Sequence, residues 1–518
     1  MAPDPGTGAG EPAPGGAGRP ARLDTEVLVV GAGPVGLMLA AELARGGVDV
    51  IVVEKRKAPS TESRASTLHA RTMEILDARD LLPDVGTPPN EPQGHFGGLQ
   101  LDLTLPGTHP GQWKVPQTKT EAVLEEWAIS RGVDIRCGHE LVAAGEVGEH
   151  VEAEAVGRDG VLRLRARYLV ACDGEDSTVR RLTGVDFPGN DAGRELLRAD
   201  VDGIDIPNRR FQRMERGLAI AWRNDKGVTR VMVHEFGGTA GPRTADASFE
   251  EVATVWKRVT GEDISGGTPL WVNSFGDTSR QLASYRHGRV LFAGDAAHRQ
   301  MPVGGQALNL GLQDAFNLGW KLALTVRGRA PEDLLDTYHE ERHEVGRRVL
   351  ANIRAQALLL LGGPEVEPLR TLVVELTGLE DVRAHLAGMI SGLDVRYPVP
   401  GPAHPLLGAR LPHTVVRSGG RHLGSTAELL RAPGGLLLDV GGTGVRVPAG
   451  WADRVTAVAG DAEPGSLPGE PGAVLVRPDG HVVWVGRSGE RDGDADGLAE
   501  ALGRWFGPPR PPAGPATP

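Results

Sequence analysis

The chain has 518 residues, which is too many for one hydrophobic core, so the sequence predicts two or three domains. Its 56 Lys and Arg residues face 68 Asp and Glu residues, and a net charge of −12 argues against a nucleic-acid partner. The two cysteines, Cys137 and Cys172, support neither a disulfide framework nor a cysteine zinc site.

Both ends of the chain are rich in Pro, Gly and Ala. Residues 1–22 lack the apolar core of a signal peptide, and we expect them, like residues 509–518, to be disordered tails. No run approaches the roughly 18 apolar residues that a membrane span requires. We therefore expect a soluble, cytoplasmic protein with no membrane partner.

The first ordered segment is predicted to be a βαβ unit. Glu26–Val30 is a continuous apolar run typical of a buried strand, and it leads into "GAGPVG", Gly31–Gly36. A helical pattern follows, and "DVIVVEK" gives a second buried strand that ends at Glu54. This order indicates a parallel sheet with helices on its faces.

The glycine pattern in this unit predicts a dinucleotide site. Gly31, Gly33 and Gly36 permit a tight turn and a close approach of a pyrophosphate to the amides at a helix start. Glu54 stands at about the spacing expected of an acid that binds a ribose. The motif alone leaves open whether the dinucleotide is FAD or NAD.

Further along the chain, helical patterns cover Ser66–Ala78 and Thr120–Arg131, and a strand is predicted near Tyr168–Ala171. From Phe187 to Ser279 the pattern changes to alternating runs that favour antiparallel strands, with one helix at Ser248–Val259. The first domain is therefore predicted to be interrupted by a second.

The buried-strand pattern returns at Val290, and a long helix is predicted over Gln306–Val326. Helical pattern dominates Ala330–Leu361, and "YPVPGPAHP", Tyr397–Pro405, is typical of a linker. The last hundred or so residues predict a small α/β domain that closes with a helix near Gly497–Phe506.

Two acidic turns complete a set of three motifs. Asp173-Gly174 and Gly294-Asp295 each follow a strand, and each alone could be a helix cap or a turn. In this order, in "ACDGEDSTVRR" and "LFAGDAAHRQMPVGGQALNLGLQDAFNLGWKLA", they resemble the aromatic-hydroxylase (group A) family of FAD-dependent monooxygenases. The stretch "LLDTYHEERHEVGRRVLANIRAQ" is similar to its subgroup of angucycline-type polyketide oxygenases. The resemblance covers about residues 24–510.

The resemblance implies an α/β fold in three parts. A Rossmann-like FAD-binding domain, residues 23–186 and 280–396, is interrupted by an antiparallel-sheet domain for substrate, residues 187–279. A thioredoxin-like domain follows over residues 406–508. That domain contains no cysteine, so C-x-x-C redox activity is excluded, and we expect it to serve packing or assembly.

The resemblance also implies which residues contact FAD. Glu54 would bind the adenosine ribose, Arg64 would reach the phosphate side, and Gln117 would contact the flavin. Ala307 departs from the family, where many members carry Gly. Arg180 would help Asp173 to support FAD and the approach of the nicotinamide cofactor. The full set is Gly31, Gly33, Pro34, Val35, Gly36, Glu54, Lys55, Arg64, Gln117, Leu141, Asp173, Asp295, Pro302, Gly305, Ala307, Leu308 and Asn309.

In this scheme no side chain is catalytic, because the flavin performs the chemistry. The isoalloxazine ring would lie against "PVGGQALN", near the Pro302 backbone, with the amides of Leu308 and Asn309 facing its N1/O2 edge. A helix N-terminus there stabilises negative charge by up to about 2 kcal/mol.

The implied reaction uses noncovalent FAD, NADPH or NADH, and O2. A flavin C4a-hydroperoxide would hydroxylate a polycyclic aromatic polyketide, while Baeyer–Villiger insertion and epoxidation stay open as alternatives. The protein would be a monomer or a homodimer. Substrate would lie between the flavin and the middle sheet, where ordinary core packing is an equal alternative for the residues that strand alternation selects, Trp222, Met232, His234 and Phe236.

One pattern points to different chemistry. His339-Glu340-x-x-His343 satisfies the H-E-x-x-H pattern of zinc hydrolases, with histidines four residues apart on a predicted helix. No third ligand follows at a recognised spacing, and charged helices of this kind usually present a solvated face or a domain contact. We expect no metal, and a zinc hydrolase is the remote alternative.

Overall fold

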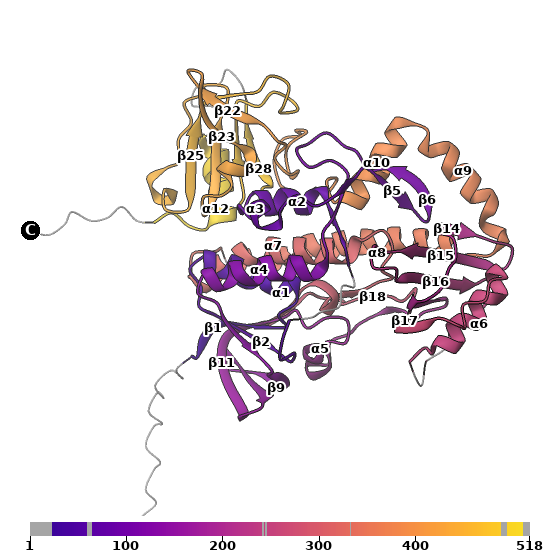
Figure 1. Cartoon of the computed structure of the whole chain (residues 1–518). Coiled ribbons are helices and arrows are strands. Elements are labelled where there is room, and N and C mark those ends of the chain that lie inside the picture. The colour runs from indigo at the N-terminus through magenta and orange to yellow at the C-terminus, as the bar shows by residue number, and fades with distance from the viewer. Residues whose placement is uncertain are drawn as a thin grey trace, which may run out of the picture.

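The computed structural model describes residues 23–59, 65–240, 243, 246–331, 333–487 and 495–510. Arg64, the predicted tail 1–22 and most of the tail 509–518 lie outside the described residues. Figure 1 shows a large sheet with helices stacked on one face, a second sheet beside it, and a C-terminal unit with its own strands. Among the described helices, none combines the length and apolar composition that a bilayer crossing needs.

Five parallel strands form the centre of the largest sheet, in the order β20-β11-β1-β2-β8. This confirms the predicted parallel sheet. Strand β1 leads through α1 to β2 on one side, while β11 and β20 lie on the other, so the strand order reverses beside β1, where ligands of such sheets bind. The strands are β1 (Thr25–Val30), β2 (Val50–Glu54), β8 (Asp134–Cys137), β11 (Gly160–Ala171) and β20 (Val290–Phe292).

Antiparallel strands extend this sheet, and small sheets flank it. The additional strands of the main sheet are β9 (Glu140–Val147), β10 (His150–Gly157) and β19 (Arg286–His287). The flanking strands are β3 (Thr67–His69), β4 (Asn90–Glu91), β5 (Gln93–Phe96), β6 (Leu99–Asp102), β7 (Gln112–Lys114), β12 (Gly189–Asn190), β18 (Ser279–Gln281) and β21 (His298–Arg299).

Helices α1 and α7 pack against each other and stand, with α4, over one face of the sheet (Figure 1). The predicted helix Gln306–Val326 is confirmed. The predicted helix from Ser66 begins only at Ala70, because Thr67–His69 pair as a strand with β7. The helices are α1 (Pro34–Arg45), α2 (Ala70–Asp77), α3 (Leu82–Val85), α4 (Gln117–Ser130), α5 (Thr178–Thr183), α7 (Gln306–Val326), α8 (Asp336–Leu361), α9 (Glu367–Thr377) and α10 (Glu380–Ser391), with short 3-10 turns η1 (Gly294–Ala296) and η2 (Pro364–Val366).

The middle segment forms an antiparallel sheet in the order β14-β15-β16-β13-β17, as the alternating pattern predicts. Helix α6 (Phe249–Thr260) covers one face through an apolar cluster, and its N-cap Ser248 accepts from Glu251 N. The other face packs against α8. The strands are β13 (Glu195–Asp202), β14 (Arg209–Arg213), β15 (Gly217–Arg223), β16 (Thr229–Glu235) and β17 (Thr268–Gly276).

The C-terminal unit contains a four-stranded mixed sheet in the order β25-β24-β27-β28. Helix α12 (Ala495–Phe506) packs on it through Trp505 and Phe506, which share an apolar cluster with Trp320 of α7. The C-terminal unit therefore has its own sheet and shares an apolar core with α7, which packs on the main sheet. Its remaining elements are β22 (Val415–Ser418), β23 (Arg421–Ser425), α11 (Thr426–Leu429), β24 (Gly435–Asp439), η3 (Ala449–Trp451), β25 (Val455–Ala459), β26 (Asp461–Ala462), β27 (Ala473–Val476) and β28 (Val482–Gly486).

Candidate functional site

The three sequence motifs meet at one edge of the main sheet. The last residue of β1, Val30, is in register with Ala171 at the end of β11, which in turn is in register with Phe292 at the end of β20. The turns that follow these strands hold the glycine motif, Asp173-Gly174 and Gly294-Asp295. Because parallel strands end at the same edge, the fold brings all three motifs to the point where the strand order reverses.

The three motif glycines meet different spatial demands. Gly31 has φ +102°, and a Cβ there would lie 2.4 Å from Cys172 O; a Cβ on Gly36 would lie 2.0 Å from Gly31 O. A Cβ on Gly33, by contrast, would have no described atom within 4 Å. Gly31 and Gly36 are thus required for backbone packing, whereas Gly33 borders open space.

That open space lies at the start of α1. The N-cap is Gly33, which has no side chain to cap the helix, and the first turn Pro34-Val35-Gly36 is uncharged. The amides of a helix start have no partner within the helix, and the helix dipole adds positive potential. The Val35 side chain is held between η1 and α7, where Cβ atoms on Gly294 or Gly311 would contact it. The site is therefore suited to an anion such as a pyrophosphate.

The Glu54 carboxylate is fixed beside the glycine turn. It accepts from Ala32 N at 2.7 Å, and from the backbone N and Nε of Arg56 at 2.8 and 3.0 Å. Burial acts to raise the pKa of Glu54, but these hydrogen bonds outweigh it and lower the pKa, so the group is an anion. Lys55 is exposed, and the residue that sequence reasoning missed is Arg56, which also pairs with Glu121 at 3.7 Å.

Two other predicted contacts lie near this corner. The Gln117 side chain accepts from Ala65 N at 3.2 Å and donates to Glu121 at 2.8 Å, at the start of α4. Leu141 is buried in β9, two residues after His139, whose amide donates to Glu54 O at 2.9 Å. Both predicted residues therefore stand around the end of β2, on which Glu54 lies.

The two acidic turns complete the edge. Asp173 Oδ2 accepts from Val179 N at 3.1 Å, while its Oδ1 is buried without a hydrogen-bond partner among the described residues. Arg180 reaches across to Ala296 O at 3.1 Å and so links the two turns. The Asp295 side chain is exposed at the surface of η1. The exposed Asp295 carboxylate is therefore open to a ligand, whereas Asp173 Oδ1 is shielded by the protein.

Helix α7 begins with an open N-terminus at the same edge. Gly304 and Gly305 have φ +68° and +66°, and the first turn Gln306-Ala307-Leu308 is uncharged. By helix geometry the amides of residues 305–308 lack helical acceptors, whereas the Asn309 amide can bond to Gly305 O. Leu308 is half-buried, and the side chain of Pro302, in the preceding loop, is exposed.

The Asn309 side chain fixes this turn in place. Its Oδ1 accepts from His69 N at 2.9 Å and Thr72 Oγ1 at 2.6 Å, and its Nδ2 donates to Thr67 O and Gly305 O. The buried His69 ring donates from Nε2 to Gly304 O at 2.8 Å. Burial lowers the pKa of His69 to about 4, so its ring is neutral near pH 7. The sequence showed no pattern that singled out His69.

The four predicted substrate-lining residues share the sheet face opposite α6, as alternation requires. His234 and Phe236 line a cavity of about 660 Å3 beside the end of α8. Met232 instead packs in the apolar cluster with α8, and Trp222 is 58% exposed; neither lines that cavity. Both ring nitrogens of His234 lie at backbone carbonyls, of Glu195 at 2.7 Å and Leu361 at 3.0 Å.

The H-E-x-x-H histidines make protein contacts on the surface of α8. His343 Nε2 donates to Leu282 O at 3.0 Å, and His339 Nδ1 accepts from Tyr285 N at 3.3 Å. Glu340 is exposed, whereas Glu341 and Arg342, between the histidines, are buried. Within the residues that the structure describes, no group of three His, Cys, Asp or Glu side chains is placed to hold a metal ion.

These residues fit FAD on geometric grounds. The empty space at Gly33 and the two helix starts supply donors for phosphate, and the carboxylates of Glu54 and Asp295 supply acceptors for hydroxyl groups along one edge. The site combines neutral helix starts with fixed carboxylates and holds no nucleophile paired with a base. Such a site can bind a dinucleotide and stabilise charge on it.

The comparisons with known proteins agree with this geometry. Residues 24–353 match the FAD binding domain family, and residues 404–509 match the aromatic-ring hydroxylase C-terminal family. A 12-dehydrotetracycline 5-monooxygenase/anhydrotetracycline 6-monooxygenase of Streptomyces rimosus is 41% identical over 508 residues, covering 93% of this chain and 99% of that protein. A rifampicin monooxygenase of Streptomyces venezuelae is also 41% identical, covering 93% and 98%.

Solved structures give the same result. The aromatic hydroxylase CabE from angucycline biosynthesis superposes with a TM-score of 0.87 at 48% identity, covering 94% of this chain and 100% of that one. The expected family, its α/β fold and its FAD cofactor are thereby confirmed. The chain belongs to the FAD-dependent aromatic-ring hydroxylase family of monooxygenases.

Proposed function

We propose that FAD lies along the edge where the three motifs meet. Its pyrophosphate would contact the helix start at Gly33, its adenosine ribose the Glu54 carboxylate, and its ring the α7 start at residues 302–309. The support is the alignment of three turns at one edge, with open space at Gly33 and an exposed carboxylate at Asp295. In this arrangement the chain divides at the predicted boundaries, with 187–279 as the substrate domain and 406–508 as a thioredoxin-like domain.

When bound, FAD accepts electrons from NADPH or NADH and activates O2 for transfer to substrate. The chain's own contribution is position and charge. The amides at the α7 start would face the pyrimidine edge of the bound flavin and would stabilise negative charge there by up to about 2 kcal/mol. The neutral ring of His69 and the side-chain amide of Asn309 hold that helix start rigidly. This limits reorganisation of the protein when negative charge develops on a ligand there.

We propose a polycyclic aromatic polyketide as the substrate. Two relatives act, by their names, on tetracycline intermediates and rifampicin, and CabE is described as an aromatic hydroxylase from angucycline biosynthesis. The inner face of the middle sheet presents Phe211, Ile220, Met232 and Phe275 to α8 and to the loop residues Met301 and Val303. This apolar, aromatic-bearing face borders the cavity that His234 and Phe236 line, and such a surface suits a flat ring system.

The decisive experiment is turnover under labelled dioxygen. Purified protein with FAD, NAD(P)H and a panel of polycyclic phenolic substrates should yield a product that gains one oxygen atom from 18O2. A new phenol in the product supports hydroxylation, a ring-expanded lactone shows Baeyer–Villiger insertion, and an oxirane shows epoxidation. Product without label, or NAD(P)H oxidation that no substrate stimulates, would contradict the proposal. Reactions without NAD(P)H are the control.

A further inference from the structure

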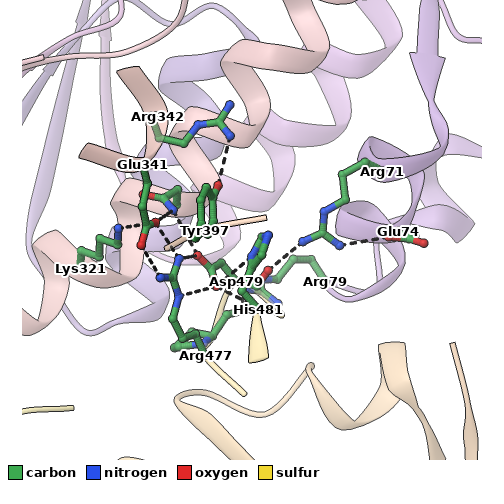
Figure 2. A network of polar contacts seen from close by, with 12 residues as sticks. Arg71, Glu74, Arg79, Lys321, Glu341, Arg342, Tyr397, Arg477, Asp479 and His481 are labelled. Carbon is green, nitrogen blue, oxygen red and sulfur yellow. Dashed lines mark hydrogen bonds and ion pairs between the residues drawn. The ribbon is translucent and has the colours of Figure 1, made fainter. Parts of the chain in front are cut away.

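The C-terminal unit inserts the tip of a β-hairpin between α2, α7 and α8 (Figure 2). The hairpin joins β27 to β28, and its tip, residues 477–481, carries the charged side chains of Arg477 and Asp479 in full burial. Arg71 of α2 donates to Asp479 O at 2.8 Å. The charged turn of this hairpin is therefore buried between other elements, and each buried charge requires a partner.

Arg477 finds its partner on α8. It donates to both oxygens of Glu341, at 2.6 and 2.9 Å, and from Nε to Asp479 at 3.0 Å. Glu341 in turn accepts from two α7 side chains, Lys321 Nζ at 2.8 Å and Asn317 Nδ2 at 2.7 Å. A bidentate Arg–carboxylate pair fixes distance and orientation together, so the tip and the two helices are set in one geometry.

Arg342, the next residue of α8, contacts residues nearer to the main sheet. Arg342 donates from Nε to Asp314 at 2.7 Å, from Nη2 to Leu310 O at 3.2 Å, and from Nη1 to Tyr397 OH at 3.1 Å. The Tyr397 ring also lies under the Arg477 guanidinium, whose carbon is 5.0 Å from the ring centre. Figure 2 shows Tyr397 between the two arginines.

The chain of contacts ends at the second acidic turn. Asp314 Oδ2 accepts from Gly294 N at 3.2 Å and from His298 Nε2 at 2.8 Å. Gly294 immediately precedes Asp295, the predicted FAD contact, and His298 follows the same turn. One buried carboxylate therefore holds both sides of the Gly294-Asp295 turn against α7.

Charge is balanced along this route, with three cations and three anions whose side chains are at most 2% exposed. Removal of one partner from a buried pair leaves an uncompensated charge and is strongly destabilising. The groups therefore hold one another in a single arrangement. They are Asp314, Lys321, Glu341, Arg342, Arg477 and Asp479.

We propose that docking of the hairpin tip 477–481 sets the position of the Gly294-Asp295 turn and thereby the affinity for FAD. Arg342 and Asp314 are the positioning residues that connect the two. The inference rests on the proposed FAD site, and it gives the C-terminal unit a role beyond packing. Loss of the tip would leave Glu341 with only its α7 partners Lys321 and Asn317, and the resulting shift of the α8 segment that carries Arg342 would loosen the Asp314 contact to the turn.

The test compares two arginines that join the same unit to the rest of the chain. Arg477→Met breaks the route to α8, while Arg431→Met removes the pair of the same unit with Asp80, which is 2.9 Å long and has no contact with the tip 477–481. Arg477→Met should lower the melting temperature more than Arg431→Met does, because the Arg431 pair is partly exposed. In titrations of apoprotein with FAD, followed by quenching of flavin fluorescence, Arg477→Met should raise Kd at least tenfold and Arg431→Met less than twofold.

A double variant tests the route itself. Asp314→Asn should also weaken FAD binding, and the Arg477→Met/Asp314→Asn double variant should bind FAD no more weakly than the weaker-binding single variant, because both changes act on the same turn. If the two losses multiply, the residues act independently and the proposed route is wrong. Equal FAD affinities for wild type and Arg477→Met would also overturn it.

A milder substitution decides the matter if Arg477→Met does not fold. Tyr397→Phe removes only the hydroxyl that accepts from Arg342 and keeps the ring under Arg477. We expect a Kd for FAD raised about threefold, and an unchanged value would contradict the inference. Wild-type protein that binds no FAD would instead refute the proposed function, so the two failures are distinguishable.

Discussion

A substitution at Gly33 should affect cofactor binding without affecting folding. We predict that Gly33→Ala folds normally and binds FAD poorly. Its φ of −77° is allowed for alanine, and the new methyl group would meet no described atom within 4 Å. The methyl would instead occupy the space in which we place the pyrophosphate.

The size of the effect follows from the contacts at stake. Displacing a phosphate from one backbone amide loses a charge-assisted hydrogen bond worth about 1.5–3 kcal/mol, which raises Kd roughly 10- to 150-fold. The folding free energy should change by less than about 1 kcal/mol, because the lower entropy of the unfolded alanine chain offsets a weaker helix cap.

The matched variant is Gly36→Ala, whose Cβ would lie 2.0 Å from Gly31 O. Overpacking against the backbone should destabilise the apoprotein by about 2–3 kcal/mol. Urea unfolding of both apoproteins and FAD titration by fluorescence quenching give the comparison. Wild-type affinity for FAD in a folded Gly33→Ala protein would show that the pyrophosphate does not lie at this helix start.

Three further outcomes follow from the structure. Glu341 has a pKa lowered to about 2 from an ordinary 4.5, with burial opposing and Arg477 and Lys321 causing the shift; its stabilisation of about 3 kcal/mol is complete above pH 4.5 and is lost as pH falls toward 2. The difference in unfolding free energy between wild type and Glu341→Gln should therefore decrease as the pH falls over that range. A difference that stays constant would show that the Glu341 pKa is not lowered. Asn309→Leu should destabilise the fold by about 3 kcal/mol in urea unfolding, because it leaves His69 N, Thr72 Oγ1 and Thr67 O without their hydrogen-bond partner; a loss below 1 kcal/mol would contradict this. Protein treated with EDTA should keep its monooxygenase activity, and one zinc ion per chain by elemental analysis would revive the H-E-x-x-H hypothesis at His339 and His343.

The glycine turn was predictable because its requirements are local. A strand, a glycine turn and a helix within thirty residues indicate the backbone geometry and a dinucleotide as the class of ligand, and the structure puts Gly31, Gly33 and Gly36 where that geometry needs them. The α7 start was predictable for the same reason. The error at Ser66–His69 arose because pairing with β7, more than forty residues away, overrides a local helical pattern.

Residues that act through distant partners left no local trace. Arg56 is one of many arginines, and only the fold shows that it clamps Glu54 against Ala32. His69 lies more than two hundred residues from Gly304, whose carbonyl it binds. The lining of the substrate site is similar in kind, since alternation selects a sheet face but not the part of that face that borders a cavity.

The segment His339–His343 shows what helix periodicity can predict and what it cannot. Histidines four residues apart share one side of α8, and that spacing suggested a metal. Tyr338, Glu341, Arg342 and Val345 follow the other recurrence, i, i+3, i+4 and i+7, and all four are buried. Two apolar residues at those positions already indicate that the inner face of the helix includes the two charges between them. A buried acidic residue and a buried basic residue that are neighbours on a helix both require oppositely charged partners, which other elements supply here. Periodicity therefore indicates an interdomain contact at this segment, but the partners Arg477 and Asp314 can be identified only in the folded chain.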